Sequence, residues 1–130
     1  MRAESALLDA YAEWHRLAAA SRQAIQARNW AFVLECHDVI LKLQPRISQL
    51  SHEAITEWQN ARVKPLVGRK RIRSVVLELI NLVESNNSLI KSVKERARSQ
   101  YQQRQQASRK LKRLQQSYAV AQQTAWSSFS

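Results

Sequence analysis

The chain has 130 residues, a length typical of one domain, which we expect to span residues 1–130. It contains one glycine and two prolines, so few of its residues favour turns. A β-sandwich needs a turn signal about every 8–12 residues, and this sequence lacks them. Because Ala, Leu, Gln and Arg are good helix formers, the composition predicts an all-α fold.

The single cysteine, Cys36, excludes an internal disulfide and a zinc site built from several cysteines. The N-terminus has no apolar run that resembles a signal peptide. No stretch approaches the ~18 uncharged apolar residues of a membrane span. These features predict a soluble, cytoplasmic protein with no membrane span.

The net charge of +11 is unevenly distributed. Residues 1–61 carry six Lys/Arg and seven Asp/Glu, whereas residues 62–130 carry fifteen and three. A positive field of this size favours an acidic partner, which would be nucleic acid, an anionic membrane surface or an acidic protein patch.

The first helix is predicted from about residue 5 to residue 28. Small or apolar residues recur there at steps of three and four, namely Leu7, Leu8, Tyr11, Trp14, Ala18, Ser21, Ala24 and Ile25. A corner follows at residues 28–30. The side chain of Asn29 can cap the next helix by accepting a hydrogen bond from one of its free N–H groups.

The second helix is predicted over residues 30–61. Its apolar residues form a heptad seam of Val33, Cys36, Ile40, Leu43, Ile47, Leu50 and Ala54. Pro45 lies inside the seam, where a proline costs about 3 kcal/mol or more. The seam keeps its phase across Pro45, which favours one kinked helix; a break at Gln44 is the alternative.

A second corner is predicted at residues 62–68, because Pro65 disfavours helix at Lys64 and Gly68 is the only glycine. A third helix is then expected over residues 69–120. It is the longest of the three, so its C-terminal half would project, fold back or pair with another chain. The expected architecture is an up-down-up bundle or antiparallel hairpin of three long helices with coiled-coil-like packing.

The third helix carries a heptad seam of Ile72, Val75, Leu79, Leu82, Asn86, Leu89 and Val93. Asn86 would either fix the register of the seam or simply bond to a neighbouring helix or water. The seam weakens after Val93 and resumes with Leu111, Leu114, Tyr118 and Ala121. Residues 121–130 are predicted to be a frayed tail, in which Trp126 is either an anchor for a partner or part of a disordered end.

No catalytic, cofactor or metal site is expected. The three histidines lack a metal-binding spacing. Cys36 and His37 are neighbours, but adjacent helix residues point about 100° apart and do not face each other. Cys36 belongs to the seam, where a buried cysteine serves as a small apolar filler. The carboxylates are scattered, and one glycine cannot build a phosphate-binding loop.

Two basic clusters are candidate binding surfaces. The first lies at the start of the third helix, where cations oppose the helix dipole, so a functional role gains weight. The second lies near the end of that helix, where cations suit the dipole. Such clusters can contact phosphates, although no known nucleic-acid-reading motif accompanies them. The residues are Arg69, Lys70, Arg71 and Arg73, and Arg109, Lys110, Lys112 and Arg113.

Residues 7–120 resemble the FliT and FlgN families of flagellar type III export chaperones. The first half is similar to the FliT pattern in Tyr11, the run at residues 21–27 and the Asn29-Trp30 corner. Residues 80–90 are similar to the Asn-containing stretch of FlgN-type chaperones, and the basic run ending in Leu114-x-x-x-Tyr118 resembles the end common to both. The strong basic charge departs from these families, whose members are often acidic.

The resemblance implies a chaperone that holds an export substrate by an amphipathic C-terminal segment of a filament cap or hook-associated protein. An overlong third helix with an apolar seam would offer a groove for a partner helix. Packing inside the chain's own core is the alternative for each of these residues. The candidate partner-binding residues are Leu79, Leu82, Val83, Asn86, Leu89, Ile90 and Val93, together with Trp126.

The leading hypothesis is a cytoplasmic, non-enzymatic chaperone or adaptor that binds a flagellar export substrate, or the export apparatus, by helix-in-groove packing. The alternatives are a basic helical nucleic-acid-binding protein and a structural coiled-coil subunit. The seams also allow a homo-oligomer.

Overall fold

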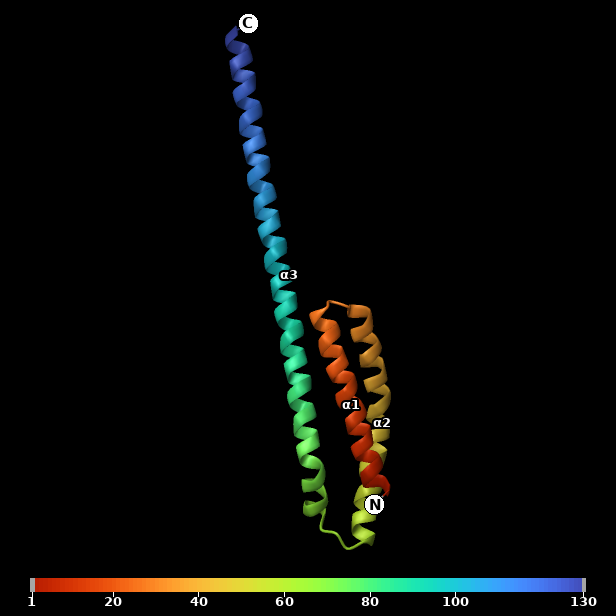
Figure 1. Cartoon of the computed structure of the whole chain (residues 1–130). Helices are drawn as coiled ribbons and strands as arrows, with labels where there is room; N and C mark the ends of the chain where they lie inside the picture. The colour runs from red at the N-terminus through yellow and green to blue at the C-terminus, as the bar shows by residue number, and fades with distance from the viewer. Residues whose placement is uncertain (1, 130) are drawn as a thin grey trace. The chain divides into compact units, whose positions relative to one another are not determined.

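The protein consists of three α-helices, as the computed structural model shows (Figure 1). It describes the backbone of residues 2–129 and the side chains of residues 2–120. The helices are α1 (Arg2–Gln26), α2 (Trp30–Asn60) and α3 (Pro65–Phe129), and no strand occurs in this described part. The all-α prediction with three long helices is therefore confirmed. The chain divides into two compact units, residues 1–90 and 91–130, and a single domain over residues 1–130 stays a prediction.

In the first unit, α1 and α2 run antiparallel, and the first part of α3 lies along α1 (Figure 1). The order is therefore up-down-up. The predicted seams of the second and third helices face inwards, as does the predicted periodic face of the first, since Leu7, Ile47 and Ile72 are buried in one core. The buried members of this core are Ala3, Leu7, Ala10, Ile47, Ala54, Trp58 and Ile72.

The first corner follows the sequence closely. The Asn29 side chain accepts a hydrogen bond from the Phe32 N–H at 3.3 Å, so the predicted N-cap of α2 is confirmed. Arg28 adopts a left-handed backbone with φ of 57°, and the Asn29 N–H donates to the Ala24 carbonyl at 2.8 Å. This is the hydrogen-bond pattern of a Schellman ending to α1.

The second corner is shorter than expected and corrects the prediction at residues 62–68. Pro65 begins α3 because proline suits the first position of a helix, where its missing N–H is not needed. The left-handed residue is Arg62, with φ of 58°, and not the glycine. Gly68 lies inside α3, against the indole ring of Trp58.

Two further segments of the chain are helical without a break. α2 runs through Pro45, which excludes the alternative break at Gln44, and the kink there stays a prediction. α3 continues to Phe129, so the backbone of the segment expected to be a frayed tail is helical. This segment has no glycine or proline, which break helices, and it contains two Ala and two Gln, which favour helix.

Polar contacts from the other two helices fix both ends of α1. At its N-terminus, the Ala3 N–H donates to both carboxylate oxygens of Glu57 at 3.0 Å, which supplies a cap from α2. About two turns before its last residue, the Ala18 carbonyl accepts from Asn86 Nδ2 of α3 at 2.9 Å. Because both neighbours bond to it, α1 is the central helix of the first unit.

Gly68→Ala tests the contact between α3 and Trp58. A Cβ atom at this position would overlap the indole, so we expect the free energy of unfolding to fall by about 1–3 kcal/mol. At an ordinary helix position, the same change raises it by up to about 1 kcal/mol. The measurement is urea denaturation followed by circular dichroism.

The matched control for that measurement is Ser74→Ala, at an exposed position of the same helix, with an expected change below about 0.5 kcal/mol. A Gly68→Ala protein as stable as the parent would show that the indole does not pack tightly on α3.

Candidate helix-binding groove

Three neighbouring hollows in the first unit follow the face of α1 that lies between α2 and α3. The first, with a volume of about 470 Å³, shares Tyr11 and Val76 with the second. The second shares Trp14 and Val83 with the third. Together they make one continuous channel, here named the central groove.

The floor of the central groove is one stripe of α1. Its residues recur at steps of three and four, which places them on one helix face. From Leu7 to Ile25, the stripe is about 27 Å long at ~1.5 Å per residue. The groove is therefore long enough for a helix of about 18 residues. The floor residues are Leu7, Tyr11, Trp14, Ala18, Ser21 and Ile25.

The walls are formed by a second, largely apolar stripe of α3, beside the seam that packs in the core, and by a mixed face of α2. On α3 this stripe runs one position after the seam, through Val76, Ile80, Val83, Asn87 and Ile90. On α2 the wall includes the seam residues Val33 and Ile40, the polar residues His37, Gln44 and Ser51, and the apolar residues Leu34, Ile55 and Trp58.

Several large apolar side chains of the walls remain open to solvent. Leu66 is 66% exposed, Leu77 46% and Ile80 44%. Contiguous apolar surface of this kind marks an interaction site in a folded protein, because burying it against a partner removes it from water.

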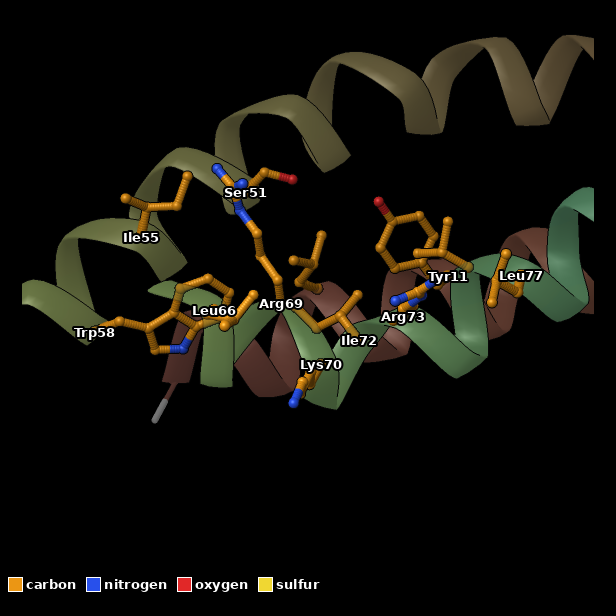
Figure 2. A pocket seen from close by; sticks show the side chains of 12 residues that line it. Tyr11, Ser51, Ile55, Trp58, Leu66, Arg69, Lys70, Ile72, Arg73 and Leu77 are labelled. Carbon is orange, nitrogen blue, oxygen red and sulfur yellow. The ribbon is translucent and has the colours of Figure 1, made fainter. Parts of the chain in front are cut away.

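One end of the central groove is basic. Arg69, Lys70 and Arg73 line the hollow at the start of α3, where the positive end of the helix dipole adds to their field. Figure 2 shows Arg69 extending from α3 towards Ser51 on α2, while Lys70 points the other way. Among the described side chains, neither of the two ion pairs involves these three cations. This end therefore attracts a carboxylate.

The fourth cation of the first cluster has a structural role. Arg71 forms an ion pair with Glu4 at 3.5 Å, which joins the first turns of α1 and α3. The second predicted cluster, at residues 109–113, lies in the second unit, and all of its side chains are exposed.

Half of the predicted partner-binding residues line the central groove. Leu79, Val83, Asn86 and Ile90 do so, although Leu79 and Asn86 are buried. Leu79 and Asn86 therefore contribute mainly to the chain's own core, which was the alternative prediction for these residues.

The other predicted partner-binding residues lie elsewhere. Leu82 and Leu89 are half-buried and are not among the residues that line the groove. Val93 belongs to the second unit, and the side chain of Trp126 lies outside the described residues.

The sequence did not lead to a prediction that Leu66, Leu77 and Ile80 line a groove, because only one apolar seam was considered on the third helix. A signal was present, since the wall residues of α3 repeat at steps of three and four beside the seam. A helix with two such stripes has an apolar face wide enough for two neighbouring helices.

Asn86 is bonded to a neighbouring helix, which was one of the two predictions for it. The side chain is buried, and its Nδ2 donates to the Ala18 carbonyl. Its Oδ1 has no hydrogen-bond partner among the described residues. The residue therefore supplies one defined contact between α3 and α1.

The described residues contain no cluster of His, Cys, Asp and Glu that could hold a metal ion. Cys36 is buried while His37 lines the groove, so the two side chains take different surroundings. Burial raises the pKa of the Cys36 thiol, and the negative charge of Glu35 adds to this rise. In the same part of the chain, no helix has an apolar stretch sufficient to cross a bilayer.

Comparison with models of protein families, with curated proteins and with solved structures finds no match to this chain.

Asn86→Asp tests the buried contact between α3 and α1. A carboxylate there loses the bond to Ala18 and is buried without a partner, so we expect a loss of about 3 kcal/mol or more at pH 7. Burial raises the pKa of such a carboxyl, so the loss shrinks as the pH falls and the group becomes neutral. Urea denaturation at pH 7 and pH 4 measures both values.

The matched control is Asn87→Asp, at the exposed neighbouring position, where we expect a change below about 0.5 kcal/mol. Equal losses in the two variants would mean that the hydrogen bond to α1 contributes nothing to stability.

The Cys36 thiol should resist modification in the folded protein, because it is buried and its pKa is raised. We expect negligible reaction with a disulfide reagent at pH 8 and complete reaction after unfolding in urea. Absorbance of the released thiolate follows both. Rapid labelling of the native protein would contradict the packing of α2 against α1.

Proposed function

We propose that this protein is a chaperone or adaptor that binds one amphipathic helix of a partner protein in the central groove. The observation that carries the proposal is the continuous apolar channel over α1, with open walls on α2 and α3. A helix laid in this channel would bury side chains such as Leu77 and Ile80 and complete a four-helix arrangement.

The positive charge at one end of the central groove determines which kind of partner helix it favours. The end lined by Arg69 and Arg73 favours a partner with Asp or Glu at the corresponding end of its helix. A second copy of this chain is a poor occupant, because its exposed helical segment at residues 94–120 is itself strongly basic. The groove therefore suits an amphipathic helix with an acidic end from a different protein.

The resemblance to the FliT and FlgN families indicates which partner to test first. It supports a cytoplasmic export chaperone whose substrate is a filament cap or hook-associated protein, held by its C-terminal amphipathic segment. The export apparatus is a second source of such a helix. A single bound helix is consistent with either partner.

The experiment uses the purified chain and labelled synthetic peptides of the C-terminal segments of the cap and hook-associated proteins from the same organism. We expect one or more peptides to bind and to become helical, measured by fluorescence anisotropy and circular dichroism. Ile80→Glu places a charge in the wall of the groove and should weaken binding by more than about tenfold.

Val39→Glu is the matched control, because Val39 is 42% exposed on α2, lies on the face opposite the wall residues and does not line the groove. It should change the affinity by less than about twofold. If no peptide binds, the export assignment is wrong; if both variants weaken binding equally, the groove is not the binding site.

A further inference from the structure

Residues 94–120 of the second unit form an exposed basic helix. Every side chain of residues 94–120 is exposed, and the large apolar ones include Tyr101 at 63%, Leu111 at 58%, Leu114 at 66% and Tyr118 at 74%. Helices in proteins gain most of their stability from packing an apolar face. This stretch therefore carries apolar side chains, such as Leu111, Leu114 and Tyr118, that remain open to solvent.

Five apolar residues of this stretch fall on two positions of a heptad. Ala97, Leu111 and Tyr118 share the first position with Arg104, and Ala107 and Leu114 share the second with Gln100. This is a narrow seam of two positions per heptad, which is the pattern of a coiled coil. A helix that lies in a membrane interface has a broader apolar face, and Arg104 interrupts this one.

Charge restricts the partner of this seam. Residues 91–130 carry nine Lys/Arg and one acidic residue, Glu95. In a parallel pair of copies, Arg104 would face the same residue of the second copy. In an antiparallel pair, the flanking cations Arg96 and Lys110 would meet cations, and like charges repel. An acidic helix pairs with the same positions favourably.

We propose that residues 94–120 form a second docking surface, which binds one acidic amphipathic helix of another protein as a two-stranded coiled coil. The partner's apolar residues would cover Leu111, Leu114 and Tyr118, and its carboxylates would lie beside Arg96, Arg104 and Lys110. This surface and the central groove have no residue in common, and the proposal does not depend on what occupies that groove.

The apolar seam favours a helix over nucleic acid. Phosphates would contact cations around the whole helix, including Arg109 on the outer face, and would leave Leu111 and Leu114 in water. Binding of an acidic helix uses both the charges and the seam.

The experiment uses the full chain and two synthetic peptides of about 28 residues (four heptads) with the same leucine seam. One has Glu at the flanking positions, and the other has Lys. By fluorescence anisotropy, we expect the Glu peptide to bind at least about tenfold more tightly than the Lys peptide. Equal affinities, or no binding of the Glu peptide, would overturn the proposal.

Substitutions in the seam locate the site. Leu111→Ser combined with Leu114→Ser should lower the affinity for the Glu peptide by more than about tenfold, because the apolar contact is lost. Ile80→Glu, in the central groove, should change the affinity for the Glu peptide by less than about twofold. The opposite result would place the peptide in the groove and would overturn the second surface.

Two arginines provide the matched charge control. Arg104→Gln and Arg109→Gln each remove one cation, but only Arg104 lies in the seam. We expect Arg104→Gln to lower the affinity for the Glu peptide by about threefold or more, and Arg109→Gln to lower it by less than about twofold. Equal losses, or a 20-base-pair DNA duplex that binds more tightly than the peptide at the same salt concentration, would indicate a general polyanion surface and overturn the proposal.

Discussion

The arrangement of the first unit depends on the close packing of Trp58 against the one position of α3 that has no side chain, Gly68. The buried indole N–H has no hydrogen-bond partner among the described residues, so shape and not polarity holds the ring. The contact brings the start of α3 to the end of α2. Next to it, Glu57 caps α1, and Arg71 pairs with Glu4. Three helix ends are thereby joined at one point, and α1 becomes the helix on which both neighbours pack.

The central position of α1 explains why the groove exists. Asn86 and Arg22 tie the other end of α1 to α3, since Asn86 donates to Ala18 and Arg22 donates to the Ser85 hydroxyl at 2.6 Å. With both neighbours packed on α1, the second apolar stripe of α3 and the mixed wall of α2 face the space above it. Closing that space needs a fourth helix, which the first unit does not contain. The proposed function follows from this unfilled position.

The two proposed surfaces differ in physical character. The central groove is concave and apolar along its length, with positive charge at one end, so shape and apolar burial would dominate the affinity of its ligand. The heptad seam of the second unit is a single convex helix with cations beside it, so electrostatics would contribute more to partner choice. An adaptor with both surfaces could hold one helix while a second, acidic protein binds elsewhere on the chain. The basic second half would then serve recognition, a role that the helical fold alone does not require.

Local chemistry in the sequence determined the three helices, the Asn29 cap, the core seams and the uneven charge, because periodicity and capping depend on neighbouring residues. The start of α3 was misplaced, since the glycine that suggested a corner is needed for contact with Trp58, a residue ten positions earlier. The heptad pattern identified which helix faces are apolar. It did not show how many neighbouring helices cover each face. Val83 and Ile90 were therefore found as candidates, whereas Leu66, Leu77 and Ile80 were not. Only the tertiary structure decided that α1 lies between the other two helices, because the cap from Glu57 and the bond from Asn86 join residues 54 and 68 positions apart.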